Sequence, residues 1–228
     1  MIQPREGVYI VVPAFNESAA VHEVVRDLRT EFPNVVVVDD GSSDATSREA
    51  MRAGAVVLRH AINRGQGAAL QTGIEYAVRR DADVVVTFDA DGQHRVEDVH
   101  RLLEALERDG ADVAIGSRFL GLRSNVPAPR RVLLRMAARF MRFTSGVALT
   151  DAHNGLRALK RNAAERIELT IDGMAHASEI VDQIHALRLR VTEVAVVIHY
   201  SDYSMRKGQS GFAAFRIAFD YLMKRIFR

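Results

Sequence analysis

The stretch VVVTFDADGQH, residues 84–94, indicates the fold class because a strand-like run leads directly into a polar loop. Val84–Phe88 is a short apolar run, typical of a strand covered on both faces. Asp89 and Asp91 follow at once, and two carboxylates at a strand end can share one hard cation. An EF-hand calcium loop fits less well, because it needs a preceding helix and a glutamate at loop position 12, where this chain has His100.

Strand and helix patterns alternate on both sides of this stretch. Strand-like apolar runs lie at residues 8–12, 35–38, 56–58, 84–88 and 113–115, with helix-like periodicity between them. This alternation predicts an α/β fold with a mostly parallel sheet and helices on both faces. Further along the chain we expect a loop at 121–129, an amphipathic helix at 130–143, a loop at 151–157, a helix near 178–189 and a strand at 191–199.

Length and composition limit the possible classes of protein. The chain has 228 residues, of which 48% are hydrophobic and 26% charged, so a disordered chain is excluded. We expect one domain over residues 1–211 and a C-terminal amphipathic helix over 212–228. The absence of cysteine excludes disulfides, thiolate metal sites and a cysteine nucleophile. The apolar runs are too short to span a membrane and residues 1–6 do not resemble a signal peptide, so we expect a cytoplasmic protein.

Charge is divided unevenly along the chain. Residues 1–117 hold 12 Lys and Arg against 20 Asp and Glu, a net charge of −8. Residues 118–228 hold 19 against 9, a net charge of +10, and the two halves add to the overall +2. A basic half of this kind predicts contact with an anionic partner, either nucleic acid or a membrane surface.

Polar side chains follow four of the predicted strands. They are Asn16-Glu17, Asp39-Asp40, Asn63-Arg64-Gly65 and Asp89-Ala90-Asp91. In an open parallel sheet, ligands bind beyond the carboxyl ends of the strands, so these clusters predict a binding site. A dinucleotide site is a weaker interpretation. Gly65 and Gly67 match two glycines of its fingerprint, but Leu70 replaces the third and the motif follows the third strand.

Several motifs together resemble a known enzyme family. Residues 11–17 (VVPAFNE), 37–44 (VVDDGSSD), 63–69 (NRGQGAA) and 89–93 (DADGQ) are similar to motifs of family-2 glycosyltransferases of the GT-A fold. Residues 116–118 (GSR) and 150–157 (TDAHNGLR) narrow the resemblance to the dolichol-phosphate mannosyltransferase-like branch, which glycosylates polyprenyl phosphates. The resemblance covers about residues 7–211.

The resemblance implies roles for the side chains that would bind the sugar donor. Residues of two loops would hold the base and ribose of a nucleoside diphosphate sugar: Pro13, Asn16, Glu17, Asp39 and Asp40. Arg64 would lie near the diphosphate. Mg²⁺ or Mn²⁺ would be bound by Asp89, Asp91 and Gln93, and the cation would neutralise the departing nucleoside diphosphate.

The resemblance also implies a catalytic set, which consists of Asp91, Arg118, Arg131 and Lys207. The two arginines would contact phosphate groups of acceptor or donor, and Lys207 would close over the site from a glycine-flanked loop. A phosphate monoester is already largely ionised at neutral pH, whereas a sugar hydroxyl needs a base to remove its proton. Asp151 and Glu179 match polar positions of the branch, and the sequence leaves open whether either acts as a base or as scaffold.

The predicted activity is therefore an inverting, metal-dependent transfer. A mannose- or glucose-type sugar would move from a nucleoside diphosphate to a polyprenyl phosphate at the cytoplasmic face of the membrane. The alternative is transfer to a glycan hydroxyl in polysaccharide or O-antigen assembly. A sugar-1-phosphate nucleotidyltransferase is disfavoured because its glycine-rich first loop is replaced by residues 13–16, and a nucleic-acid binder would not explain the acidic strand ends. The donor sugar and base, the lipid and the oligomeric state stay open.

Two amphipathic segments predict that the protein binds membranes peripherally. Arginines recur on one face of the expected helix at 130–143: Arg131, Arg135, Arg139 and Arg142. An apolar stripe beside basic residues marks the expected C-terminal helix: Phe212, Phe215, Phe219, Met223 and Ile226. Basic amphipathic helices of this kind lie in membrane interfaces. Alternatively, both faces pack on the sheet or on a partner subunit, or a small membrane protein recruits the enzyme through them.

Overall fold

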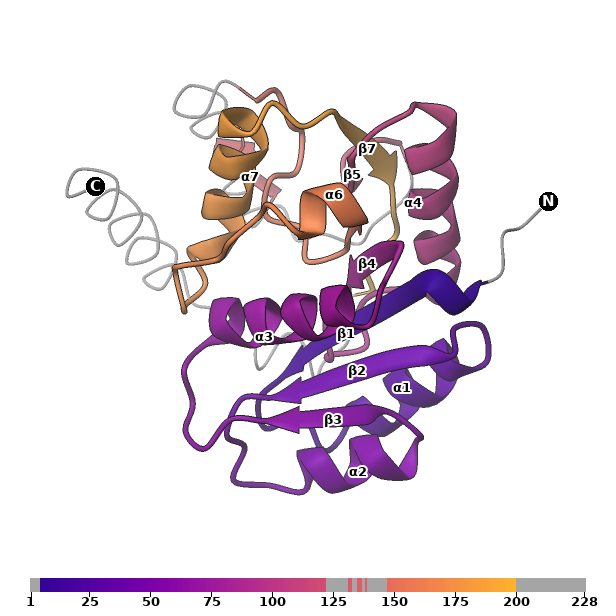
Figure 1. Cartoon of the computed structure of the whole chain (residues 1–228), viewed down its shortest axis with the longest axis vertical. Coiled ribbons are helices and arrows are strands. Elements are labelled where there is room, and N and C mark those ends of the chain that lie inside the picture. Colours follow the sequence, from indigo (N-terminus) through magenta and orange to yellow (C-terminus); the bar gives the residue numbers. More distant parts are fainter. Residues whose placement is uncertain (1–4, 122–130, 133–134, 137, 139–146, 200–228) are drawn as a thin grey trace.

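The computed structural model describes residues 5–121, 131–132, 135–136, 138 and 147–199. Within these residues, seven strands form one sheet in the order β3-β2-β1-β4-β6-β5-β7 (Figure 1). The strands are β1 (Val8–Ala14), β2 (Asn34–Asp39), β3 (Val56–Arg59), β4 (Val84–Thr87), β5 (Val113–Ser117), β6 (Arg157–Lys160) and β7 (Val191–Ala195). The α/β fold predicted from the alternating patterns is confirmed.

Helices cover both faces of the sheet, as predicted. Apolar residues of α1 (Val21–Arg29), α2 (Thr46–Arg52) and α4 (Val96–Arg108) pack into one core. The second core lies on the other face, beneath α3 (Gln66–Arg79), α6 (Arg161–Ala164) and α7 (His176–Ala186). A 3₁₀ turn, η1 (Arg5–Gly7), precedes β1. The central strands β2 and β4 consist of nearly continuous valine runs because both of their faces are buried.

One strand departs from the parallel arrangement. β1 pairs in parallel with β2 and β4, and β5 pairs in parallel with β7, but β6 lies antiparallel between β4 and β5. The sequence predicts a loop at 151–157 and no strand directly after it, but Arg157 is the first residue of β6, so this prediction is wrong. Only two apolar residues separate the charged ends of β6, too few to give a periodic signal. Because β6 is antiparallel, its first residue lies near the carboxyl ends of its neighbours, with Arg157 opposite Thr87, the last residue of β4, and opposite Ile115, two residues before the end of β5.

Most other elements lie close to their predicted positions. The helix expected near 178–189 begins at His176 and ends at Ala186, and the strand expected at 191–199 ends at Ala195. That strand stops where β5 stops, because Ala195 faces Ser117, the last residue of its partner. Residues 131–132, 135–136 and 138 are helical, as expected for the helix at 130–143. Lys207, the helix at 212–228, Arg139 and Arg142 lie outside the described residues.

Candidate active site

A cleft of about 450 Å³ opens at the carboxyl ends of the central strands. Its walls come from the ends of β1, β2, β4 and β5 and from the loops that precede α3, β6 and α7. Seven of the residues with a predicted binding or catalytic role line this cleft: Pro13, Glu17, Asp40, Asp89, Asp91, Gln93 and Arg118. The polar clusters that follow the separate strands therefore meet in one site, as the parallel topology requires.

Asp40 fixes the loop that leads into α3. Its carboxylate accepts hydrogen bonds from the backbone N–H groups of Arg64 (2.9 Å) and Gly65 (2.6 Å), and His60 Nδ1 lies 2.7 Å from Asp40 Oδ1. Asp39 is fully buried and faces its own turn instead, where it accepts hydrogen bonds from Ser42 N–H and the Ser47 hydroxyl. Asp39 thus holds the loop beside the cleft and does not line it.

The loop after β1 is joined to the loop after β2. Ser43 N–H donates to Asn16 Oδ1 (2.9 Å), Asn16 N–H donates to Ser42 Oγ (2.9 Å) and Glu17 N–H donates to Thr46 Oγ1 (2.8 Å). Asn16 has a φ of 53°, a left-handed conformation that asparagine adopts more readily than most residues. Asn16 therefore shapes the wall of the cleft, while its neighbour Glu17 lines it.

Arg64 lies at the edge of the site. Its side chain is exposed and its Nη2 is 3.5 Å from Asp172 Oδ1. The backbone here is tightly packed, because a Cβ on Gly65 would lie 2.4 Å from the carbonyl oxygen of Asp172. Gly65 also has a φ of 114°, which disfavours any side chain. The loop before α3 and the loop before α7 therefore approach each other closely beside the cleft.

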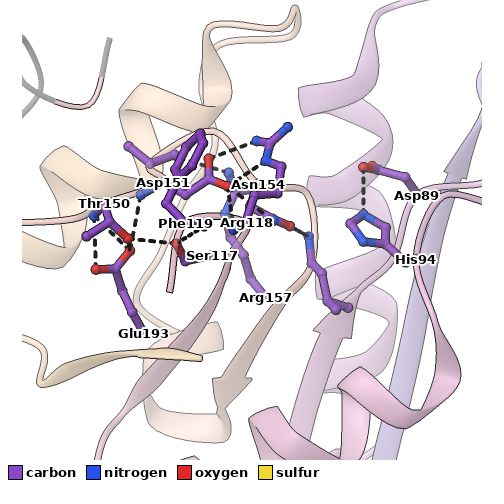
Figure 2. A network of polar contacts seen from close by, with 12 residues as sticks. Asp89, His94, Ser117, Arg118, Phe119, Thr150, Asp151, Asn154, Arg157 and Glu193 are labelled. Atoms are coloured by element: carbon purple, nitrogen blue, oxygen red, sulfur yellow. Dashed lines mark hydrogen bonds and ion pairs between the residues drawn. The ribbon is translucent and has the colours of Figure 1, made fainter. Parts of the chain in front are cut away.

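The floor of the site is formed by Asp89 and the groups around it. Gln66 Nε2 donates to Asp89 Oδ1 (3.0 Å). His94 Nε2 lies 3.1 Å from Asp89 Oδ2, as Figure 2 shows. Burial would raise the pKa of Asp89, but the hydrogen bond with His94 and the charge of Arg157 outweigh it and hold the pKa below its usual value. A Cβ on Gly155 would lie 2.1 Å from Asp89 Oδ2, so only glycine leaves room for this carboxylate.

The pKa of Asp91 is shifted in the opposite direction from that of Asp89. Burial, and then the negative charge of Asp89, raise the pKa of Asp91 to about 6. Gln93 N–H donates to Asp91 Oδ1 (3.1 Å), which turns the loop. The side chains of Asp89, Asp91 and Gln93 all line the cleft. Two neighbouring carboxylates that repel each other favour a cation, and carboxylate and amide oxygens are ligands that Mg²⁺ accepts.

These residues fit a divalent cation only if further ligands come from outside the chain. Among the residues that the structure describes, no group of three or more His, Asp or Glu side chains is arranged to hold a metal ion. Asp89, Asp91 and Gln93 would supply part of an oxygen coordination shell. Mg²⁺ is typically held by one or two carboxylates together with water and substrate phosphates, and the donor set here fits that pattern.

Arg118 and Asp151 form a buried bidentate ion pair at the other side of the cleft. Arg118 Nε donates to Asp151 Oδ2 (2.6 Å) and Nη2 donates to Oδ1 (2.8 Å), as Figure 2 shows. The Arg118 side chain is 8% exposed and that of Asp151 is 1% exposed. Both oxygens of Asp151 are engaged, so its carboxylate orients the guanidinium. Glu179 is also buried and accepts hydrogen bonds from Thr170 and Ile171.

Two positioning residues were missed in the sequence. Glu193 on β7 accepts hydrogen bonds from the backbone N–H groups of Thr150 (2.8 Å) and Asp151 (3.1 Å), which fixes the loop that carries Asp151. Arg157 is 1% exposed, and its Nη2 donates to Ala152 O at 3.4 Å. Its Nε and Nη1 have no hydrogen-bond partner among the described residues. Arg157 ends the motif at residues 150–157, but no role was predicted for it; that motif and its apolar neighbours Leu156 and Ala158 were the available sequence signals.

Two buried histidines near Arg157 have lowered pKa values. Burial, and then the positive charge of Arg157, lower the pKa values of His153 and His176 to about 4. Both rings are therefore neutral at pH 7. Burial lowers the pKa of Arg157 itself to about 10, and Asp89 and Asp151 partly oppose that effect, so the guanidinium stays charged.

Arg131 lies away from the cleft lining. It is exposed, on the helical segment that also contains Arg135. The Arg135 guanidinium lies over the Phe119 ring, 5.5 Å from its centroid, which connects this segment to the residue after Arg118. Within the described part of the chain, no helix is long and apolar enough to cross a membrane.

Comparison with known proteins identifies the family. A family model described as glycosyl transferase family 2 matches residues 9–168, which is more than two thirds of the chain. The chain belongs to glycosyl transferase family 2. It is a glycosyltransferase, and the resemblance found in the sequence motifs is confirmed.

Curated relatives of this glycosyltransferase align over most of its length. It is 37% identical to the uncharacterized protein MJ1222 of Methanocaldococcus jannaschii, over 98% of this chain and 94% of that protein. It is 32% identical to the polyprenol monophosphomannose synthase of Mycolicibacterium smegmatis, over 88% and 80% of the two chains. It is 28% identical to the UDP-N-acetylglucosamine–dolichyl-phosphate N-acetylglucosaminyltransferase of Methanococcus voltae, over 96% of each.

Solved structures show the same fold. The glucosyl-3-phosphoglycerate synthase of Mycobacterium tuberculosis superposes with a TM-score of 0.72 at 19% identity, over 94% of this chain and 77% of that chain. A second structure of that enzyme, in complex with Mn²⁺, UDP-glucose and phosphoglyceric acid, gives a TM-score of 0.71 at 18% identity, over the same shares of the two chains. The fold of this glycosyltransferase is therefore GT-A, as the sequence predicted.

Proposed function

We propose that this glycosyltransferase moves a mannose- or glucose-type sugar from a nucleoside diphosphate to a polyprenyl phosphate, with inversion at the anomeric carbon. The observation that carries the proposal is the pairing of Arg118 with Asp151 across the cleft from Asp89 and Asp91. The two carboxylates can bind the divalent cation that accompanies a sugar nucleotide. The Arg118 guanidinium, oriented by Asp151, can bind the phosphate of the acceptor. Relatives named for transfer to dolichyl and polyprenol phosphates support this choice of acceptor.

The donor would occupy the side of the cleft formed by β1, β2 and β4. Asp40, Asn16, Glu17 and Pro13 would surround the base and ribose, with Asp39 fixing their loop. Asp89, Asp91 and Gln93 would hold Mg²⁺ or Mn²⁺, which when bound neutralises the leaving diphosphate. Arg64, at the rim of the same loop, would add positive charge near the diphosphate.

The acceptor phosphate would lie against Arg118. An oxygen of the phosphate attacks the anomeric carbon and forms the new C–O bond, while the bond from that carbon to the diphosphate breaks and its electron pair leaves on the diphosphate oxygen. A single displacement from the opposite face inverts the configuration. The phosphate is ionised at neutral pH, so no proton has to be removed from it. Arg118 orients the attacking group, and Asp151 and Glu193 fix Arg118.

Transfer to a glycan hydroxyl is the rival, and it needs a carboxylate or histidine as base. The two carboxylates considered for that role are both engaged: Asp151 by Arg118, and Glu179 by Thr170 and Ile171. His153, which lines the cleft, is neutral at pH 7, but its lowered pKa of about 4 makes it a weak base. These contacts favour the phosphate acceptor.

We also propose where the protein acts and how its chain is divided. The protein would bind peripherally to the cytoplasmic face of the membrane, directly or through a small membrane protein, as a monomer or homo-oligomer. The catalytic domain would span residues 1–211, with Lys207 closing over the site and residues 212–228 forming an amphipathic helix. Arg131, on the exposed helical segment beside Phe119, would contact the lipid phosphate as it enters.

A radiolabelled transfer assay tests this function. Several nucleotide sugars are offered with a short-chain polyprenyl phosphate or with the unphosphorylated polyprenol of the same length, with Mn²⁺ or with EDTA. We expect label in the lipid only with the phosphorylated acceptor and the cation. Equal labelling of the polyprenol, or labelling only of an added glycan, would contradict the proposal.

A further inference from the structure

Large exposed apolar side chains concentrate at one edge of the molecule. Among the described residues, eight such side chains are exposed, and six of them lie on segments at or next to the carboxyl-end edge of the sheet. These six are Phe15, Ile62, Leu120, Val132, Met136 and Met174, with exposed fractions between 40% and 70%, and we call them the apolar rim. The other two, Met51 and Val56, lie on α2 and at the start of β3.

Half of the apolar rim lies on loops that form the mouth of the cleft. Phe15 follows β1 and Met174 precedes α7, and both line the cleft. Ile62 precedes Asn63, which also lines it. The loop of Ile62 lies against the loop of Met174, since a Cβ on Gly65 would fall 2.4 Å from Asp172 O. These three side chains therefore surround one side of the opening.

The other half borders the acceptor side. Leu120 is two residues beyond Arg118, and the intervening Phe119 carries the Arg135 guanidinium over its ring. Val132 and Met136 are one helical turn apart on the same segment as Arg135, and their exposed fractions are 59% and 62%. The apolar rim thus continues past Arg118 onto this helical segment.

Arginines lie near three of the six apolar side chains. Arg131 directly precedes Val132 and Arg135 directly precedes Met136 on the helical segment, and Arg64 lies two residues from Ile62. Apolar side chains interleaved with arginines are typical of surfaces that lie in the bilayer interface, where the guanidinium groups meet anionic head groups.

A bilayer fits this surface better than a second copy of the chain. The core of a dimer interface is one continuous, closely packed apolar patch, whereas the six side chains of the apolar rim come from five segments spread around an opening. A protein that covered this opening would also block the cleft, but a bilayer would present the lipid phosphate to it.

We propose that the apolar rim inserts into the membrane interface and turns the mouth of the cleft toward the lipid. Arg131 and Arg135 then lie at the level of anionic head groups, and the acceptor phosphate enters beside Arg118 without leaving the surface. The inference rests on the proposed function, because only a lipid acceptor requires the cleft to face the bilayer.

Flotation of the full-length chain with vesicles tests the inference. Phosphatidylcholine vesicles with and without phosphatidylglycerol are mixed with the wild type and with the double variant Ile62→Ser/Met136→Ser, whose sites do not line the cleft. Met51→Ser is the matched control, since Met51 is similarly exposed at 57% but lies on α2. We expect the double variant to bind at least roughly tenfold more weakly and the control to bind like the wild type.

Two further measurements separate this inference from the proposed function. Transfer to a water-soluble short-chain prenyl phosphate without vesicles should be equal in wild type and double variant. If the wild type floats but transfers no sugar, the proposed function is wrong, while membrane binding by the apolar rim is supported. Equal flotation of all three proteins, or no flotation of the wild type at low salt, would overturn the inference. It would also be overturned if the wild type dimerised through these side chains and the double variant were monomeric.

Discussion

Arg118 donates two parallel hydrogen bonds to Asp151, at 2.6 Å from Nε and 2.8 Å from Nη2, although 33 residues separate the two in the chain. Both side chains are buried, so the pair fixes the guanidinium at one place in the cleft. Because a bidentate pair leaves the arginine little freedom, Arg118 can receive an anion without first becoming ordered. The side of the site that we propose for the acceptor is therefore ordered before any ligand binds.

Replacing Asp151 should damage both stability and transfer. Asp151→Asn leaves Arg118 buried without its counter-charge, which typically costs about 3–5 kcal/mol of the free energy of unfolding. We expect transfer to fall at least tenfold, with most of the change in the acceptor KM. Denaturant unfolding and steady-state kinetics measure the two effects. A variant with wild-type stability and an unchanged acceptor KM would show that the pair has no role in orienting Arg118.

The carboxylates of the floor should be needed for chemistry, but they should differ in their effect on folding. Asp91→Asn is expected to reduce transfer to background while circular dichroism and thermal unfolding stay close to wild type, and Asp89→Asn to reduce transfer to background with a lower free energy of unfolding, because Asp89 is a counter-charge of buried Arg157. Asp81→Asn is a matched control, because Asp81 precedes the same strand at its opposite end and is 84% exposed. Full activity of either cleft variant in the presence of EDTA would contradict the metal assignment.

The glycine beneath Asp89 offers a test of local geometry. Gly155→Ala would place a Cβ 2.1 Å from Asp89 Oδ2, so the carboxylate must move away from Gln66 and His94. We expect weaker binding of the nucleotide sugar in the presence of Mn²⁺, measured by calorimetry, and transfer reduced at least tenfold. Gly173→Ala is the control because nothing lies within 4 Å of the added methyl group. Identical behaviour of the two variants would contradict this account of the floor.

Stability should fall in mild acid because of His176. Its pKa is lowered to about 4 by burial and by the charge of Arg157, against about 6.5 in an unfolded chain. Between these values the unfolded state binds a proton that the folded state does not, so the free energy of unfolding falls as pH drops from 6.5 to 4. The loss from this group is on the order of 3 kcal/mol. In denaturant titrations, His176→Gln should show a flatter pH profile in this window, and an unchanged slope would contradict the assignment.

The sequence predicted the floor of the site because its residues directly follow buried parallel strands, whose carboxyl ends lie at one edge of the sheet. Asp89 and Asp91 follow a buried strand, and parallel neighbours bring Glu17 and Asp40 to the same edge. The acceptor side was harder to predict. Arg157 begins a four-residue antiparallel strand with no periodic pattern, and the pairing of Arg118 with Asp151 joins segments whose proximity depends on that strand. Burial of Asp39 depends on its turn, where Ser42 and Ser47 bond to it, which spacing alone does not reveal.

The central claim is that Arg118 receives a lipid phosphate. The most direct measurement compares wild type, Arg118→Ala and Arg131→Ala for transfer to a short-chain polyprenyl phosphate, with nucleotide-sugar affinity measured separately. Losing one charge-assisted contact to phosphate costs about 1.5–3 kcal/mol, so transfer should fall roughly ten- to a hundredfold while donor affinity stays within about twofold. Normal transfer by both variants, together with efficient use of an unphosphorylated glycan, would contradict the account.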